Sequence, residues 1–203
     1  LKNITERKPK LLWHKDTDAQ NLDLIVIPGG FTFGDYLRCG ALASNSPIIK
    51  SVKDHASRGG AILGICNGFQ ILTEAGLLPG TLIKNKNLKF LCKDVDIIIQ
   101  RTLQSPFTSG FQPNSKINLP IAHNEGNYFI SDDGLARLDY NGQIAFKYGA
   151  NNNFNGSKQD IAGILSKNGR ILGMMPHPER SIFKYHNSID GRLFFENLFL
   201  ELL

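Results

Sequence analysis

Short apolar runs alternate with helical patterns in the first half of the chain. Residues 22–27 and 60–65 are nearly continuous runs of apolar side chains, which is typical of buried parallel strands. Residues 46–58 carry apolar positions at helical spacing, and residues 69–75 continue as a helix until Gly76 ends it. This alternation predicts an α/β sheet with helices on both faces. The expected strands are 10–14, 22–27 and 60–65, and the expected helices are 46–58 and 69–75.

Beyond residue 88 the pattern changes to shorter β-like segments. Asn168-Gly169 predicts a two-residue hairpin turn between residues 161–165 and 171–175. The last residues, 189–203, have apolar positions at helical spacing and predict a helix that packs on the core. We therefore expect an open, mostly parallel sheet flanked by helices, with additional antiparallel segments after residue 88. These further segments are 88–92, 95–100, 117–122, 143–148 and 161–165.

Composition fits one domain over residues 1–203. The 203 residues are 41% hydrophobic and 20% charged, and the net charge of +5 is dispersed. The densest basic patch, residues 84–89, predicts a solvated loop and no nucleic-acid surface. No apolar run reaches membrane-spanning length, so we expect no membrane partner. Three widely spaced cysteines fit neither a disulfide framework nor a zinc site, which favours a cytoplasmic location and no bound metal.

The run Gly64-Ile65-Cys66-Asn67-Gly68 places a thiol at a sharp turn between a strand and a helix. The exposed N–H groups at the start of a helix favour a thiolate. The two glycines allow a tight turn and leave room for a substrate, as in nucleophile elbows. Cys66 is therefore a candidate nucleophile, and the alternative is a buried cysteine that packs as a small hydrophobe. Cys39 and Cys92 are expected to be inert packing residues.

The segment His177-Pro178-Glu179 supplies a candidate base together with a group to orient it. Pro178 disfavours helical backbone at His177 and predicts an extended segment. Side chains two residues apart in an extended chain point to the same side, so Glu179 could accept a hydrogen bond from one imidazole nitrogen. The other nitrogen is left for a thiol, which is the arrangement of a nucleophile, base and orienting carboxylate.

A thiolate that attacks a carbonyl also needs donors for the oxyanion. The backbone N–H of Asn67 is adjacent to the nucleophile, where elbow enzymes place one donor. The turn Pro28-Gly29-Gly30-Phe31 could supply a second donor at the end of a neighbouring strand. A tight turn without any function explains the same glycines equally well.

These motifs together resemble the triad-class glutamine amidotransferases, and among them the glutaminase subunits of phosphoribosylformylglycinamidine synthase. The resemblance covers about residues 10 to 200. It implies a class I glutamine amidotransferase fold, which is flavodoxin-like. The segments that carry it are 28–38, 66–80, 120–126, 155–157 and 174–180.

The resemblance implies roles for individual residues. Cys66 corresponds to the nucleophile, His177 to the acid/base and Glu179 to its orienting carboxylate. Gly30 and Asn67 match the oxyanion positions, and Gln70 matches a position beside the bound glutamine. The implied reaction is hydrolysis of glutamine to glutamate and ammonia through a thioester on Cys66.

The resemblance also implies a synthetase partner that uses ATP and Mg²⁺, with or without a third small subunit. No phosphate-binding loop is evident in this sequence, which agrees with that division of labour. Family members begin with a strand that has no counterpart here, because Leu1 corresponds to a position near the end of the first helix. We expect that the first strand is missing from this sequence through cropping.

Two other functions remain open at this stage. One is a γ-glutamyl hydrolase or cysteine peptidase on the same scaffold, and the other is a non-catalytic glutamine-binding assembly subunit. His123 and Glu125 lie two residues apart, like the triad pair, and could form a second acid/base site. The resemblance places them at the glutamine or partner face, and a structural role is the alternative. Asp35 and Arg38 contact a partner or pair with each other on the surface.

Overall fold

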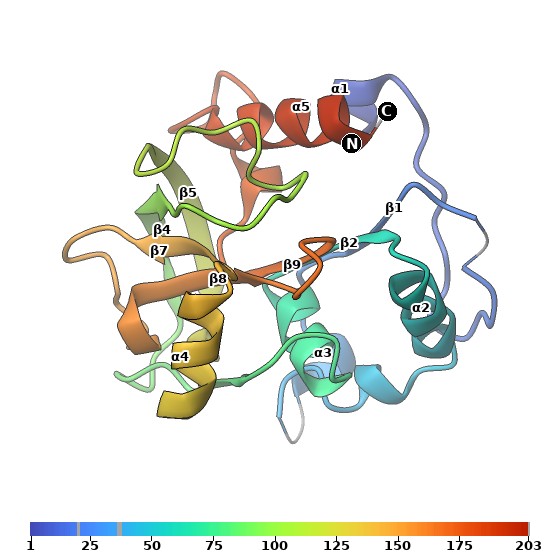
Figure 1. The fold of residues 1–203 in the computed structure, drawn as a ribbon, viewed down its shortest axis with the longest axis horizontal. Helices are drawn as coiled ribbons and strands as arrows, with labels where there is room; N and C mark the ends of the chain where they lie inside the picture. Colours follow the sequence, from blue (N-terminus) through green and yellow to red (C-terminus); the bar gives the residue numbers. More distant parts are fainter. Residues whose placement is uncertain (20, 36–37, 203) are drawn as a thin grey trace.

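A seven-stranded sheet runs through the molecule in the order β1-β2-β9-β8-β7-β4-β5 (Figure 1). The computed structural model describes residues 1–19, 21–35 and 38–202. A second, two-stranded sheet pairs β3 with β6. The strands are β1 (Leu24–Ile27), β2 (Ala61–Ile65), β3 (Thr81–Ile83), β4 (Leu91–Ile99), β5 (Lys116–His123), β6 (Asn127–Phe129), β7 (Ile144–Tyr148), β8 (Ile161–Leu165) and β9 (Ile171–Met174).

The parallel pairings join β1 to β2 and β2 to β9. All five residues of β2 are buried, as a strand covered on both faces requires. The other pairings in this sheet are antiparallel. The α/β class and the antiparallel segments after residue 88 are confirmed. Fewer of the strand pairings are parallel than the sequence predicted, because the antiparallel strands after residue 88 join the same sheet.

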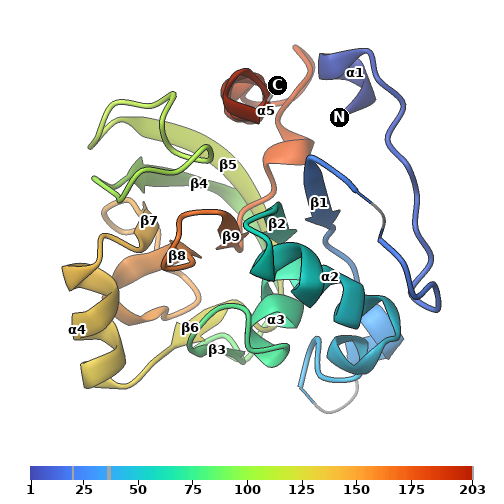
Figure 2. The ribbon, with the colours of Figure 1, turned by 45° about the vertical axis from the view of Figure 1, so that its right-hand side comes forward.

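Helices cover both faces of the sheet, as expected. Helix α3 contacts β1, β2 and β9, whereas α5 contacts β5 and a 3₁₀ turn at Pro178–Arg180. The two helices lie on opposite sides of the sheet in both views (Figures 1 and 2). Among the described residues, no helix has the length and apolar character needed to cross a membrane. The α-helices are α1 (Lys2–Thr5), α2 (Ile48–Ser57), α3 (Asn67–Glu74), α4 (Asp132–Tyr140) and α5 (Asp190–Leu202).

Several predicted elements need correction. Residues 10–14 form no strand, because a turn in which Trp13 N–H binds the Asp16 carboxylate at 2.8 Å ends the extended segment. Residues 88–92 and 95–100 belong largely to one strand, β4. The hairpin between β8 and β9 exists, but residues 166–170 all lie outside the strands.

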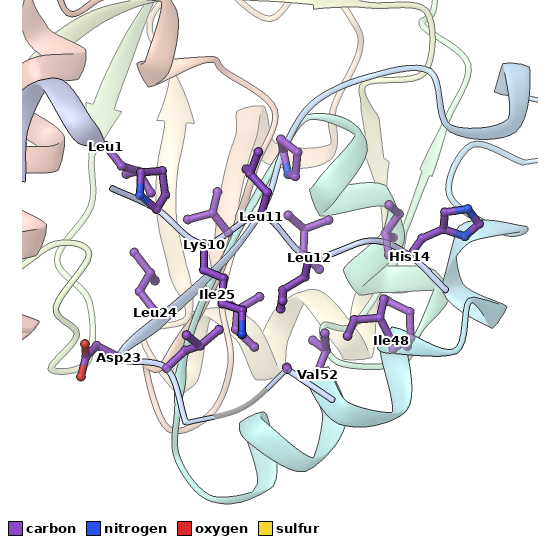
Figure 3. A pocket seen from close by; sticks show the side chains of 18 of the residues that line it. Leu1, Lys10, Leu11, Leu12, His14, Asp23, Leu24, Ile25, Ile48 and Val52 are labelled. Carbon is purple, nitrogen blue, oxygen red and sulfur yellow. The ribbon is translucent and has the colours of Figure 1, made fainter. Parts of the chain in front are cut away.

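An apolar pocket of ≈ 590 Å³ borders the edge strand β1. Its walls include Leu12, Leu24, Ile48 and Val52, and the irregular segment through residues 10–14 passes along it (Figure 3). Neither Cys66 nor His177 lines this pocket. It is therefore separate from the predicted catalytic residues.

Two glycines allow α3 to pack closely on the strands. A Cβ atom on Gly68 would lie 2.0 Å from the carbonyl oxygen of Ile27, and one on Gly64 would lie 2.8 Å from the backbone of Gly68. Neither glycine has a positive φ. These glycines therefore serve the close approach of helix to strand, and the unusual backbone of the turn belongs to Cys66 itself.

Replacing Gly68 with alanine should destabilise the fold. The new methyl group would collide with backbone, which cannot move away as a flexible side chain could, so we expect a loss on the order of 3 kcal/mol. Urea unfolding of the chain measures this change. Gly30→Ala is the matched control, since a Cβ there meets nothing within 4 Å. Equal stability of the two variants would contradict the packing argument.

Candidate active site

Cys66 follows the last residue of β2 and is the N-cap of α3. Its backbone has φ 50° and ψ −104°, a region that non-glycine residues rarely adopt. Such a conformation costs on the order of 1–3 kcal/mol and persists only where the surroundings enforce it. Here the Cys66 N–H donates to the carbonyl of Met174 at 2.8 Å, which extends the pairing of β2 with β9 by one residue. The strained turn displays the thiol at the end of the sheet.

His177 lies just beyond β9, and its backbone N–H donates to the carbonyl of Pro120 at 2.8 Å. Its Nδ1 lies 2.5 Å from Oε1 of Glu179, so this nitrogen carries the proton and Nε2 presents a lone pair. The predicted pairing is confirmed, but the predicted extended path is wrong. Pro178–Arg180 forms a 3₁₀ turn, which brings Glu179 back to the imidazole.

Cys66 and His177 meet around Gly29. A Cβ atom on Gly29 would lie 2.8 Å from Cε1 of His177 and 3.5 Å from Cβ of Cys66. The thiol donates to the carbonyl of Ala122 at 3.6 Å, and Nε2 of His177 is buried without a hydrogen-bond partner among the described residues. The thiol hydrogen bond to Ala122 therefore leaves the lone pair of His177 Nε2 unused.

The loop after β1 is tied to the first turn of α3. The Thr32 hydroxyl hydrogen-bonds the side-chain oxygen of Asn67, and Nδ2 of Asn67 donates to Gln70 at 2.8 Å. Gln70 in turn donates to the carbonyl of Glu125 at 2.7 Å. This chain of contacts places the predicted Asn67 and Gln70 beside the thiol. Gly30 lies in the same loop, and a side chain there would meet open space.

A second layer of polar groups is centred on Asn85, which is fully buried. Its Nδ2 donates to the carbonyls of Lys89 at 2.8 Å and His123 at 2.9 Å. Its Oδ1 accepts from the Gly126 N–H at 3.0 Å and lies 3.1 Å from Nδ1 of His123. Because Oδ1 has no hydrogen to give, Nδ1 of His123 must be the donor.

Burial governs the titration of two groups in this layer. The pKa of His123 is lowered to about 4, first by burial and then by the charge of His177. Burial also raises the pKa of Tyr148, whose hydroxyl accepts a hydrogen bond from Asn155 at 3.0 Å. Both groups are therefore neutral near neutral pH.

Three of the predicted site residues are closed off from solvent, whereas the Glu179 side chain is 39% exposed. His177 is 1% exposed, Gln70 4% and Cys66 5%. A substrate can reach the thiol only if part of this cover moves. Within residues 1–19, 21–35 and 38–202, no group of three or more His, Cys, Asp and Glu side chains is arranged to hold a metal ion.

The remaining predicted residues have other surroundings. Arg38 forms an ion pair with Glu74 at 2.8 Å, and the side chain of Asp35, like residues 36 and 37, lies outside the described part. The carboxylate of Glu125 accepts from the Cys39 N–H at 3.2 Å, so it is not paired with His123 as a second acid/base site. Cys39 is buried as expected, but Cys92 is exposed on β4 and is not a packing residue.

Comparison with known proteins places this site in a family. Residues 6–194 match the CobB/CobQ-like glutamine amidotransferase domain. The PurQ subunit of phosphoribosylformylglycinamidine synthase from Roseobacter denitrificans is 55% identical over 188 residues, which are 92% of this chain and 83% of that protein. The chain belongs to the PurQ glutamine amidotransferases.

Further relatives agree with this membership. The PurQ subunit of Mesorhizobium japonicum is 48% identical, over 97% of this chain and 88% of that protein. A chain in the solved structure of PurLQS from Thermotoga maritima superposes with a TM-score of 0.83 at 40% identity. The superposition covers 93% of this chain and 84% of that one, and it confirms the class I amidotransferase fold.

Sequence reasoning missed the contacts that hold the site together. Asn85 lies within the basic segment predicted to be a solvated loop, and only the three-dimensional pairing with His123 reveals it. Thr32 and Ala122 lie in segments 28–38 and 120–126, which carry the resemblance, but nothing in the sequence predicted a contact for either of them. Gly29, rather than Gly30, is the glycine on which the catalytic side chains converge.

The buried His123 should make the protein less stable in acid. Its folded pKa of about 4 lies below the ordinary value of 6.5, so the unfolded chain takes up a proton first as the pH falls. The contribution of His123 to the free energy of unfolding is complete above about pH 6.5 and is lost as the pH falls toward about pH 4. Between about pH 7 and about pH 5, the free energy of unfolding should fall by an amount on the order of 2 kcal/mol.

Urea unfolding at these two pH values measures the loss. The variant His123→Gln has no titrating ring. The difference in its free energy of unfolding between the two pH values should be smaller than that of the wild type by about that amount. An unchanged difference would contradict the assignment of a neutral, buried His123.

Proposed function

We propose that this chain is the glutaminase subunit of phosphoribosylformylglycinamidine synthase and supplies ammonia for purine biosynthesis. One observation carries the proposal: Cys66 and His177 converge on Gly29, with Glu179 bonded to the far nitrogen of the imidazole. The PurQ relatives indicate which synthetase receives the ammonia.

In the proposed reaction, Cys66 is the nucleophile and His177 the general base. The thiol proton passes to Nε2 of His177, and the sulfur attacks the carbon of the glutamine side-chain amide. Glu179 accepts the Nδ1 proton in a hydrogen bond and stabilises the imidazolium that forms. No metal is needed for this activation.

The tetrahedral intermediate places a negative charge on the former amide oxygen. The backbone N–H groups of Gly30 and Asn67 are the proposed donors to that oxygen. His177 then protonates the departing nitrogen, ammonia leaves, and a γ-glutamyl thioester remains on Cys66. Water activated by His177 completes the hydrolysis to glutamate. Gln70 lies beside the bound glutamine in this proposal.

The partner completes the overall reaction. We infer that a PurL-type synthetase subunit uses ATP and Mg²⁺ on the nucleotide substrate and receives the ammonia, as the name of the Thermotoga complex suggests. We place the reaction in the cytoplasm. The burial of Cys66 and His177 suits an enzyme that opens its thiol to glutamine when the partner docks.

A γ-glutamyl hydrolase or peptidase on the same scaffold is the competing enzyme. That function would show as hydrolysis of polyglutamyl chains or peptides by the isolated chain at rates equal to those with glutamine. A non-catalytic glutamine-binding subunit is disfavoured by the intact contacts of Cys66, His177 and Glu179. The identity with PurQ relatives favours the amidotransferase over both.

Replacing Cys66 with alanine should separate the two half-reactions. In the complex with the synthetase, the variant should lose glutamine-dependent synthesis by a factor of about 10⁴ or more and keep ammonia-dependent synthesis, because only acyl transfer requires the thiol. Steady-state assays with each nitrogen source measure both rates.

Cys92→Ala is the matched control, since it removes another thiol, one that is exposed on β4. It should retain both activities. Glutamine-dependent synthesis by Cys66→Ala at the wild-type rate would refute the catalytic assignment.

A further inference from the structure

His123 has a hydrogen-bonding capacity that the fold leaves unused. Nδ1 is the donor to Asn85, so Nε2 has a lone pair and no hydrogen. The ring is 2% exposed, and Nε2 is buried without a partner among the described residues. A buried acceptor without a donor costs free energy, so such a group is retained where a donor arrives during function.

The ring lies at the catalytic end of β5. One residue before it, the carbonyl of Ala122 accepts the Cys66 thiol, and Pro120 accepts the N–H of His177. The charge of His177 acts on the ring, and Gly126 packs against the ring, where a Cβ atom would lie 2.2 Å from Cε1 and 2.6 Å from Nε2. The ring is thus held by Asn85 and Gly126 at the end of β5 that carries Ala122.

The proposed glutaminase reaction brings an N–H donor to this place. The amide nitrogen of glutamine has two hydrogens and, in the tetrahedral intermediate, a lone pair that must face the proton on His177. Acceptors for its hydrogens would fix that orientation. When the thiol turns toward His177, the carbonyl of Ala122 becomes free for one hydrogen, and Nε2 of His123 is available for the other.

We propose that His123 is a further catalytic residue, whose Nε2 accepts a hydrogen bond from the reacting carboxamide nitrogen and directs its lone pair to His177. This inference rests on the proposed function. No proton moves to His123: the C–N bond breaks, the nitrogen takes the proton held by His177, and ammonia departs. With a pKa of about 4, His123 is too weak a base to take that proton itself.

The test compares an amide with an ester in the complex with the synthetase. Glutamate γ-methyl ester forms the same thioester, but its leaving oxygen has no hydrogen to donate. In His123→Asn the side-chain amide can still donate a hydrogen bond to Asn85, but the acceptor at the position of Nε2 is lost. We expect kcat/KM for glutamine to fall about tenfold or more, and kcat/KM for the ester to stay within about twofold of wild type.

Two further variants make the result specific. His123→Gln can present an oxygen near the position of Nε2 and should recover part of the glutamine rate. His55→Asn removes another buried imidazole, one bonded to the carbonyl of Ala61 at 3.2 Å. It should leave the ratio of kcat/KM for glutamine to kcat/KM for the ester unchanged.

If kcat/KM falls by the same factor for glutamine and for the ester in His123→Asn, the inference is overturned and the residue has a structural role. If the wild-type complex turns over neither substrate, the proposed function itself fails, which is a separate outcome. NMR of ¹⁵N-labelled histidine in the protein reports the protonation of each ring nitrogen independently. Nε2 of His123 should be unprotonated near neutral pH, and a protonated Nε2 would also overturn the inference.

Discussion

The parallel pairing of β2 with β9 is the constraint on which the site depends. Ile65 lies opposite Met174, and the Cys66 N–H continues the ladder to the Met174 carbonyl. Cys66 and His177, the proposed nucleophile and base, therefore leave the sheet at the same end, although more than a hundred residues separate them. Without this register, neither the strained Cys66 turn nor the Glu179 contact would bring the two groups together.

Close packing and burial follow from that placement. Gly68 lets α3 approach the end of β1, which sets the helix start against the loop that carries Gly29 and Thr32. The result is a site with little exposed surface, in which polar groups must satisfy one another. Asn85 does so completely, whereas Nε2 of His123 and Nε2 of His177 have no hydrogen-bond partner among the described residues.

Local motifs in the sequence predicted Cys66, His177 and Glu179, because glycines flank Cys66 at the change from strand to helix and prolines flank His177. The strands and helices near them were also predictable, since buried strands and amphipathic helices have strong patterns. Asn85 and the carbonyl of Ala122 could not be predicted, because their partners are distant in sequence. The failed strand at residues 10–14 shows that an apolar run alone does not decide a strand, since the turn bonded to Asp16 ends this one.

The proposed glutaminase reaction requires acylation of Cys66. Mass spectrometry of the complex, quenched during turnover of glutamine and digested, measures this acylation. We expect one γ-glutamyl group on the peptide that contains Cys66, and none on those with Cys39 or Cys92. Production of glutamate without any acylated Cys66 peptide, or with the acyl group on another cysteine, would contradict it.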